Sequence, residues 1–305
     1  MNKYETLVIR PPSEAQSLLL RINRGCPWNR CKFCGIYTAL GQSHYSIRTV
    51  TEIKKDIFFL KKAFPDSQTI FLGDADPLCL STDDFICILD ELKNSFPKLN
   101  RITCYARAST IWKKGISDIQ KCAKHGLNRI HIGLETGSDF LLRFHKKGLT
   151  RKVLIQTSNW LKQNNIERSY YVLLGLGGKQ YWQDHIDKTA SILTRINPEF
   201  IRIRRLWLYK KGHYGSLIDN PLFADINTGN FVPQSPEETI NELKMLLEKL
   251  DVYQTFFTCD HANNFFRIEG MLPEDKKSML EKITHFLALP EDKKQLWYDS
   301  VISQI

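Results

Sequence analysis

The sequence predicts an α/β protein whose core is an incomplete (βα)6 TIM-type barrel of parallel strands, followed by an α+β C-terminal extension. Short apolar runs alternate with amphipathic stretches through the first two-thirds of the 305 residues. Six such alternations imply a parallel sheet with right-handed crossovers. Since eight would close a barrel, six predict a partly open one. A flat, doubly wound sheet is the alternative that this pattern leaves open.

Six segments, mostly rich in β-branched or aromatic residues, are the expected strands. They are residues 17–23, 69–72, 102–105, 129–133, 170–174 and 200–208. The segments between them have helical periodicity, and several of them begin or end at Ser, Thr, Pro or Gly signals. They are residues 50–63, 82–96, 116–125, 150–163 and 182–196.

The character of the chain changes after about residue 212. A loop rich in Gly, Asn and Pro leads to a helix that we expect to begin at Ser235, with Pro236 in its first turn. The strand-like sequence TFFTC and two further helices from Leu272 onward follow. We therefore expect a core at residues 15–215 and a C-terminal extension at residues 216–305 that packs on it.

Composition excludes several classes of protein. The chain is 42% apolar and 25% charged, which is typical of globular proteins and not of disordered or collagen-like ones. No uncharged apolar run approaches the ~18 residues of a membrane helix. Residues 1–16 contain no secretion-signal pattern. We expect a soluble, cytoplasmic protein without a membrane partner.

Positive charge is concentrated in the middle of the chain. The net charge is +10, yet residues 101–215 contain 22 basic and 7 acidic residues, and residues 216–305 contain 8 and 15. A positive field of this size attracts nucleic acid, phosphorylated molecules or polycarboxylates. The alternative is that these Lys and Arg side chains are solvated on outer helix faces.

Three of the eight cysteines lie close together, in RGCPWNRCKFCGIY just after the first expected strand: Cys26, Cys31 and Cys34. Such a cluster in a long chain favours a metal over disulfides. A structural zinc ion needs four protein ligands, and His44 is the one nearby candidate for the fourth. A 4Fe–4S cluster on three cysteines leaves one iron open, as catalysis requires. Because barrel active sites lie at strand C-termini, we favour the iron–sulfur cluster.

These residues resemble the radical S-adenosylmethionine (SAM) superfamily, usually marked by C-x3-C-x-Φ-C. Here the first spacing is one residue longer, and Phe33 occupies the aromatic position. The segments RPPSEAQSLLL, IGLETGSD, LLGLGG and DHANNFF…LPEDKKSML are similar to a bacterial branch related to the oxygen-independent coproporphyrinogen oxidases. The resemblance implies one 4Fe–4S cluster on Cys26, Cys31 and Cys34. It also implies cleavage of SAM to methionine and a 5′-deoxyadenosyl radical, and a low-potential electron donor such as flavodoxin or ferredoxin.

The resemblance further suggests SAM contacts in the segment FLGDADPL. Gly73, Asp74 and Asp76 would meet the methionyl amino group, since carboxylate and carbonyl oxygens accept hydrogen bonds from an amine. The alternative is an Asx turn, in which the two aspartates bond to their own backbone.

Two further SAM contacts follow the fourth expected strand. Glu135 would accept the ribose hydroxyls, whereas Ser138 fits a helix cap. Lys147 would bind the SAM carboxylate, and its alternative is an ordinary solvated lysine.

The remaining candidates follow the fifth and sixth expected strands. Gly175 would allow close approach of the backbone to adenine or ribose. Strand alternation would point one of Arg204 and Arg205 into the cavity, and we take Arg205 as the cofactor contact. Cys259, Asp260 and His261 resemble a Cys/His catalytic pair, but adjacent residues on an extended segment point to opposite faces, so we keep His261 only as a candidate for the substrate pocket.

Two hypotheses from different classes result. The first is a radical SAM enzyme acting on a small molecule, a tetrapyrrole or RNA, with the choice among these open and an anionic substrate suited to the positive charge. The second is a zinc-containing nucleic-acid-binding protein without radical chemistry, which would use the basic middle third.

Overall fold

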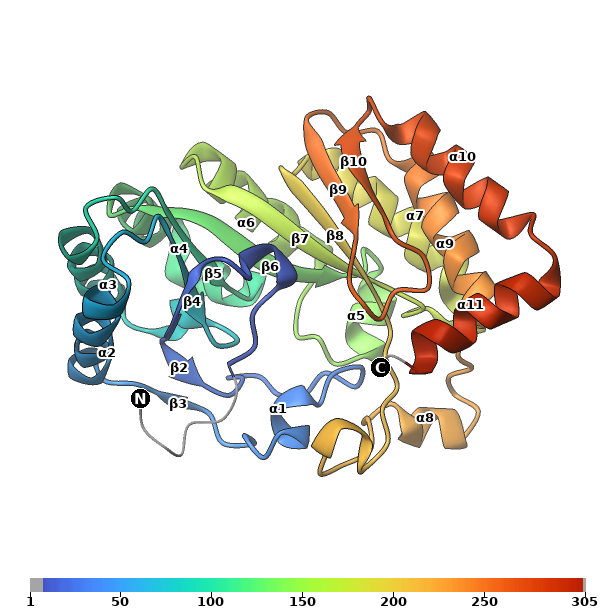
Figure 1. Ribbon diagram of the computed structural model, residues 1–305, viewed down its shortest axis with the longest axis horizontal. Coiled ribbons are helices and arrows are strands. Elements are labelled where there is room, and N and C mark those ends of the chain that lie inside the picture. The colour runs from blue at the N-terminus through green and yellow to red at the C-terminus, as the bar shows by residue number, and fades with distance from the viewer. Residues whose placement is uncertain (1–7, 304–305) are drawn as a thin grey trace.

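The computed structural model describes residues 8–303, and its centre is one eight-stranded sheet. The spatial order is β1-β4-β5-β6-β7-β8-β9-β10, in which all neighbours pair in parallel except β9 and β10, which are antiparallel. The strands are β1 (Leu18–Arg21), β4 (Thr69–Gly73), β5 (Arg101–Tyr105), β6 (Leu127–Glu135), β7 (Glu167–Leu174), β8 (Phe200–Arg205), β9 (Thr255–Cys259) and β10 (Ile268–Leu272). Figure 1 shows them side by side from β4 on the left to β10 on the right.

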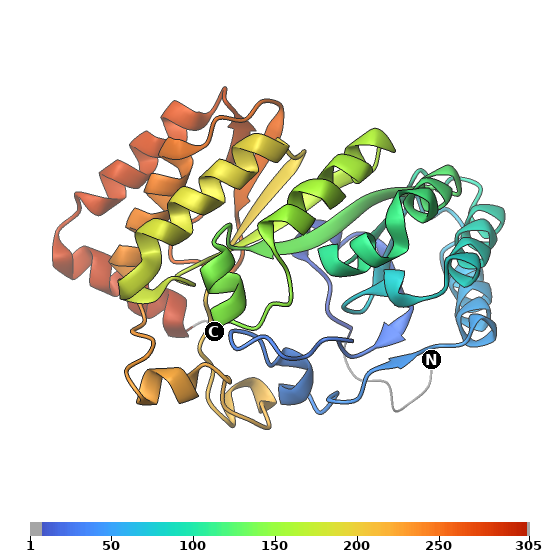
Figure 2. The same ribbon diagram turned by 180° about the vertical axis from the view of Figure 1, so that it is seen from behind.

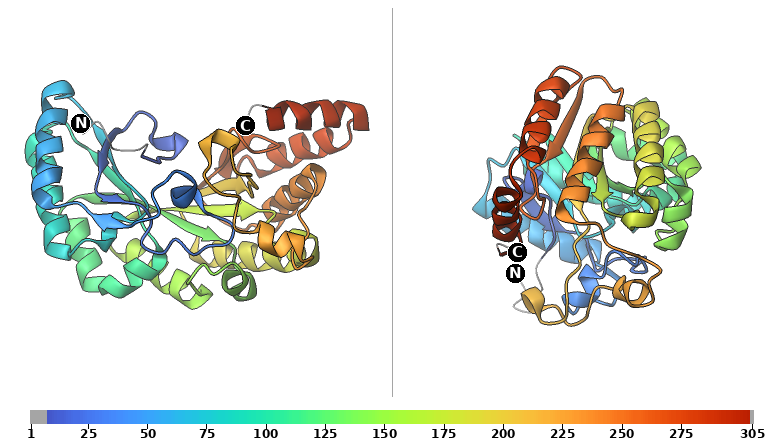
Figure 3. Two further views of the ribbon diagram at one scale, coloured as in Figure 1. Left: turned by 90° about the horizontal axis from the view of Figure 1, so that it is seen from below. Right: turned by 90° about the vertical axis from the view of Figure 1, so that its right-hand side faces the viewer.

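The helices cover the convex outer face of the curved sheet, as Figure 2 shows from behind. Seen from below, the sheet and its helices form an open trough rather than a closed ring (Figure 3). The longer helices are α2 (Val50–Ala63), α3 (Thr82–Ser95), α4 (Ala108–Lys124), α6 (Arg151–Gln163), α7 (Gly178–Ile196), α9 (Pro236–Lys249), α10 (Lys276–Leu287) and α11 (Glu291–Ser303). This arrangement confirms the predicted incomplete barrel of parallel strands and excludes the flat alternative.

Short elements complete the chain. They are η1 (Pro12–Glu14), β2 (Asn23–Arg24), α1 (Ile36–Ala39), β3 (Ser46–Ile47), η2 (Pro77–Cys79), α5 (Asp139–Phe144), η3 (His213–Gly215) and α8 (Phe223–Asn227). β2 and β3 form a separate antiparallel pair that brackets the cysteine loop. No helix between residues 8 and 303 has the length and apolar character to cross a membrane. Residues 1–7, part of the segment examined for a secretion signal, lie outside the described range.

Local signals explain most element boundaries. Thr49 caps the N-terminus of α2, and Glu52 completes the capping box. Strand β8 is shorter than expected, because it ends at Arg205 and not at residue 208. Helix α4 begins eight residues before the predicted start at residue 116, because Gly115, with φ 77°, joins two helical pieces and the sequence pattern detected only the second.

Residues 216–305 pack against the core and also extend its sheet. β9 pairs in parallel with β8, α9 packs on α7, and α10 packs on α9 and β10. The fully buried side chains of Phe257 on β9 and Leu246 on α9 belong to the same apolar core as Ile201 on β8. The division at residue 215 is therefore not a gap in the hydrophobic core.

Candidate active site

A cavity of about 400 Å³ lies beside the cysteine loop, at the C-terminal ends of several parallel strands. Seven of the eleven residues predicted to hold the cluster or SAM line it. They are Cys26, Cys31, Phe33, Cys34, Glu135, Lys147 and Arg205. These residues come from positions as far apart in the chain as 26 and 205, so the fold gathers them.

The cysteine loop is held in place by the segment that follows β8. Asn220 Nδ2 donates to the backbone oxygens of Phe33, at 3.2 Å, and Trp207, at 3.3 Å. Lys32 Nζ lies 2.8 Å from Asp225 Oδ1 in a partly buried ion pair. Figure 1 shows the consequence, with α8 next to α1 below the sheet. This loop is therefore anchored by residues almost 200 positions later in the sequence.

The three thiols fit an iron–sulfur cluster better than a single ion. Burial raises the pKa of Cys31, and it raises the pKa of Cys34 to about 12, so both thiols are protonated until a metal displaces the proton. Within residues 8–303, no three Cys, His, Asp or Glu side chains converge closely enough to share one metal ion. Zinc needs such convergence, whereas a four-iron cluster binds each thiolate at a different iron. Three thiols that line one cavity without converging on one point therefore suit a four-iron cluster.

Glu135 and Lys147 form an ion pair inside the cavity, with Lys147 Nζ 2.6 Å from Glu135 Oε1. The register of β6 against β7 shifts between Gly133 and Glu135, and Glu135 has φ 63°. This irregularity redirects the side chain at the strand end. Burial lowers the pKa of Lys147, but the neighbouring Glu135 carboxylate and Cys31 thiol outweigh it and raise that pKa overall. Lys147 is therefore cationic.

Positive charges outnumber negative ones on a cavity wall that is otherwise mainly apolar and aromatic. Arg107, Lys147, Arg204 and Arg205 line it, and Glu135 is the one carboxylate among the described lining residues. All four cations belong to the basic stretch 101–215 noted in the sequence. Part of the excess positive charge thus faces a cavity and favours anionic ligands.

Asp74 and Asp76 are buried and bound to protein groups. Asp74 Oδ2 lies 3.1 Å from Arg21 Nε, and Thr110 Oγ1 donates to Asp76 Oδ2 at 2.6 Å. Burial raises the pKa of Asp76 to about 6. Between them, Ala75 reaches the cavity, whereas Gly73, Asp74 and Asp76 are not among its lining residues. The SAM contacts predicted for these three residues remain a prediction.

The structure places the other predicted residues in several different surroundings. Gly175 lines an adjoining cavity instead, and Ser138 caps α5 as expected by accepting from Leu141 N. Arg204 and Arg205 both contact the first cavity, so the expectation that one would point outward is wrong. Both residues are still paired with β7 in the register of β8, and their side chains are long enough to reach the cavity from either face of the strand end. His261 bonds to Asn263 and does not line either cavity.

Sequence reasoning missed several residues of the site, among them Trp28, Arg107 and Gly133. Trp28 in the cysteine loop donates to Lys146 O at 2.7 Å, and the Arg107 guanidinium lies 4.7 Å from its ring centre. A Cβ on Gly133 would lie 2.1 Å from Glu135 Oε1, so the absence of a side chain there makes room for the ion pair. The sequence did contain a signal for Gly133. It lies two residues before Glu135, and residues two apart on a strand share a face.

Comparison with known proteins identifies the family of this chain. A profile of the radical SAM superfamily matches residues 20–190, which is more than half of the sequence. The chain belongs to the radical SAM superfamily, a family of enzymes whose members use SAM and a 4Fe–4S cluster. The zinc alternative receives no support from the comparisons.

The heme chaperone HemW of Buchnera aphidicola subsp. Schizaphis graminum is 23% identical over 191 residues, which cover 60% of this chain and 49% of that protein. The chain thus spans about half the length of this relative. The match confirms the expected relation to the coproporphyrinogen oxidase branch.

Solved structures agree in fold. Coproporphyrinogen III oxidase (HemN) from Escherichia coli has a TM-score of 0.57 at 13% identity, covering 76% of this chain and 51% of that one. The methyltransferase TsrM from Kitasatospora setae, solved with cobalamin and a [4Fe-4S] cluster, has a TM-score of 0.51 at 15% identity, covering 62% and 36%. At these identities the likeness concerns the fold alone.

Proposed function

We propose that this protein is a radical SAM enzyme that cleaves SAM reductively and removes a hydrogen atom from an anionic substrate. The observation that carries the proposal is the placement of three thiols, Glu135 and Lys147 around one cavity at the strand C-termini. The family membership supplies the class of chemistry.

Each side chain has a definite part in this proposal. Cys26, Cys31 and Cys34 would hold the cluster and leave one iron without a protein ligand. When bound there, the cluster supplies the electron that splits SAM into methionine and the 5′-deoxyadenosyl radical. Lys147 would exchange Glu135 for the SAM carboxylate, which frees the Glu135 carboxylate to accept the ribose hydroxyls.

Apolar groups of the protein would also limit the access of water to the reacting atoms. Phe33 and Trp207 contribute apolar surface to the cavity, and the segment that contains Asn220 covers the cysteine loop from outside. A site closed to water protects a reactive radical from side reactions. Backbone and aromatic groups of this chain would thus confine the radical to the bound substrate.

An electron donor has a plausible approach to the same loop. A depression of about 350 Å³ is lined by Cys31 and Cys34 together with Arg30, Lys32 and Lys146. Arg30 and Lys146 are exposed. We propose that a small acidic low-potential protein, such as flavodoxin or ferredoxin, docks here, because opposite charge steers such encounters.

The substrate class within this function is open between a small molecule, a tetrapyrrole and RNA. The relative named as a heme chaperone adds a heme-related molecule as a candidate substrate or partner. The four cations of the cavity suit each of these anionic classes.

The test is anaerobic reconstitution with iron and sulfide, followed by addition of dithionite and SAM. The wild type should form methionine and 5′-deoxyadenosine, and Cys31→Ala should form neither. Cys87→Ala is the matched control, because Cys87 on α3 does not line the cavity. Unchanged product from Cys31→Ala would overturn the proposal. Colourless wild-type protein with stoichiometric zinc would also overturn it. In that case, salt-sensitive retention of the protein on RNA would favour the nucleic-acid-binding alternative.

A further inference from the structure

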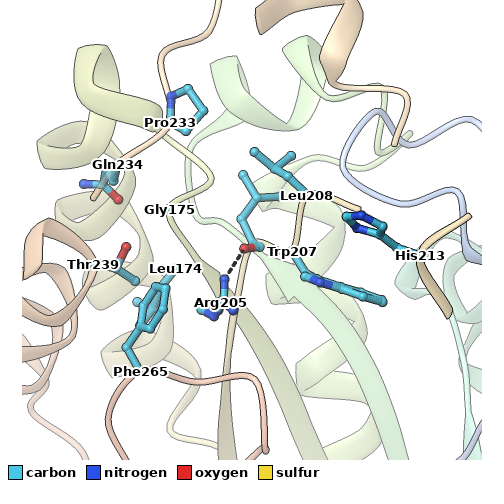
Figure 4. Close-up of a pocket in the computed structure, with 11 residues that line it drawn as sticks. Leu174, Gly175, Arg205, Trp207, Leu208, His213, Pro233, Gln234, Thr239 and Phe265 are labelled. Atoms are coloured by element: carbon cyan, nitrogen blue, oxygen red, sulfur yellow. Dashed lines mark hydrogen bonds between the residues drawn. The ribbon is translucent and has the colours of Figure 1, made fainter. Parts of the chain in front are cut away.

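A larger cavity of about 550 Å³ adjoins the cysteine cavity; we refer to it as the distal chamber. Its wall includes Leu174 at the end of β7 and Gly175 after it, Arg205 at the end of β8, Gln234 before α9, and Phe265 between β9 and β10. Figure 4 shows Arg205 between Phe265 and Trp207. Its size lies within the ~300–1,000 Å³ typical of small-molecule sites.

The distal chamber is next to the place where SAM would be cleaved. Arg205 and Trp207 line both cavities, so the two share a wall. A hydrogen atom can be abstracted only from a molecule that lies beside the radical. A ligand in the distal chamber would satisfy this requirement without displacing SAM from the cysteine cavity.

One cation is available to a ligand in the distal chamber. Arg205 is the one Lys or Arg among the described residues that line it. Its Nε donates to Asn263 O and its guanidinium lies 4.0 Å from the centre of the Phe265 ring, which fixes its position. Its Nη1 contacts Leu206 O at 3.5 Å, the limit of a hydrogen bond. A carboxylate would be a stronger partner for this nitrogen.

One acceptor in the wall also lacks a partner. Gln234 Oε1 is buried and forms no hydrogen bond to any described residue. It lies 3.7 Å from where a Cβ on Gly175 would be, so it is beside the Gly175 loop. A buried acceptor without a donor is unfavourable, and a ligand N–H or O–H would satisfy it. The remaining wall combines apolar side chains, among them Leu174, Leu208 and Pro233, with the polar side chains of Thr239 and His213.

We propose that the distal chamber is the substrate site and that the substrate is a small molecule with one carboxylate, an apolar aromatic body and one hydrogen-bond donor. Arg205, which the sequence suggested as a SAM contact, would instead bind the substrate carboxylate. Phe265 and Trp207 would contact the aromatic body, and Gln234 would accept from the donor. A single cation suits a monoanion, whereas RNA needs a series of cations along its backbone. This proposal rests on the proposed function, because it assigns the substrate of that reaction.

The experiment measures binding by calorimetry to the full-length, anaerobically reconstituted protein. The probes are aromatic monocarboxylates that carry a donor, with indole-3-acetate and 4-hydroxyphenylacetate as the first two. Three compounds serve as controls for indole-3-acetate: indole-3-ethanol lacks the charge, naphthalene-1-acetate lacks the N–H, and acetate lacks both the aromatic body and the donor. We expect at least one donor-bearing acid to bind at least tenfold more tightly than its matched compounds.

Two variants place the binding in the distal chamber. Leu208→Trp fills it, so probe affinity should fall at least tenfold, whereas Leu217→Trp, at a position 58% exposed, should leave it unchanged. Gln234→Leu removes the acceptor, so it should lower the affinity for indole-3-acetate to that for naphthalene-1-acetate. The affinity for naphthalene-1-acetate, which has no N–H, should not change. A general structural defect would weaken both, so this variant also decides the matter if Leu208→Trp does not fold.

Three results would overturn the proposal. The first is that no acid in the set binds better than its uncharged counterpart. The second is that Leu208→Trp lowers the affinity for S-adenosylhomocysteine as much as the affinity for the probe, since the distal chamber would then belong to the SAM site. The third is that RNA or a tetrapyrrole polycarboxylate displaces the probe at lower concentration. Failure of the proposed function is seen separately, as absence of 5′-deoxyadenosine from wild-type protein whatever the probe does.

Discussion

Lys147 Nζ lies 2.6 Å from Glu135 Oε1, so two residues predicted to bind opposite ends of SAM are partners of one another. Their side chains are 12% and 15% exposed, which makes the pair largely buried. Removing one member of a buried pair leaves the other charge uncompensated. The pair therefore links the stability of the empty site to its capacity to bind SAM.

Substitution of either partner tests this link. Lys147→Met should lower SAM affinity about tenfold or more, since a charge-assisted bond contributes about 1.5–3 kcal/mol, and it should also lower the melting temperature. The double variant Lys147→Met/Glu135→Gln should regain part of the lost stability, because no lone charge remains, but none of the affinity. Calorimetry and thermal melts check both. Recovery of affinity in the double variant would contradict the role of Lys147.

Gly133 is expected to be required for the ion pair but not for the fold. A methyl group there would lie 2.1 Å from Glu135 Oε1 and 2.7 Å from Lys147 Nζ. Because both atoms end flexible side chains, they can move aside without disturbing the backbone. Gly133→Ala should therefore weaken SAM binding about tenfold and retain full iron and sulfide content. Unaltered SAM affinity would show that the pair has no part in binding.

Glu242 on α9 should make stability depend on pH. Its Oε2 accepts from Gly175 N at 2.5 Å, and burial raises its pKa to about 8 from an ordinary 4.5. His185 Nε2, 4.0 Å from Glu242 Oε1, adds no charge, because burial lowers the pKa of His185 to about 3. The folded protein thus keeps a proton that the unfolded chain releases.

Stability attributable to this proton should fall as pH rises from about 4.5 to about 8. Glu242→Gln removes the titration and keeps an acceptor for Gly175 N. The melting temperature of the variant, relative to the wild type, should be several degrees higher at pH 8 than at pH 5. Parallel curves for the two proteins across this range would refute the assignment.

Phe257 tests whether residues 216–305 unfold with the core. It is fully buried on β9, opposite Ile201 of β8 in the parallel register. Phe257→Ala should cost about 3–5 kcal/mol. Denaturation followed by circular dichroism and by tryptophan fluorescence should give one coincident transition at lower denaturant. Two separated transitions would instead mark the C-terminal segment as an independent unit.

The sequence alone determined a parallel sheet with helical crossovers, most element boundaries and the cysteine loop as the centre of the site, whereas the choice between an open barrel and a flat sheet required the structure. These features depend on local patterns, such as apolar periodicity, caps and cysteine spacing, that neighbouring residues specify. Errors arose where the local pattern was interrupted, as at Gly115 within α4, or where a strand stopped early, as at Arg205.

Only the tertiary structure decided which distant groups meet. Glu135 forms an ion pair with Lys147, Asp74 forms one with Arg21, and Asn220 donates a hydrogen bond to the cysteine loop. The structure also shows that the missing side chain of Gly133 leaves room for the ion pair, and that the distal chamber adjoins the cysteine cavity. Such contacts depend on how strands curve and how loops from separate crossovers converge, and no spacing within a linear segment encodes that geometry.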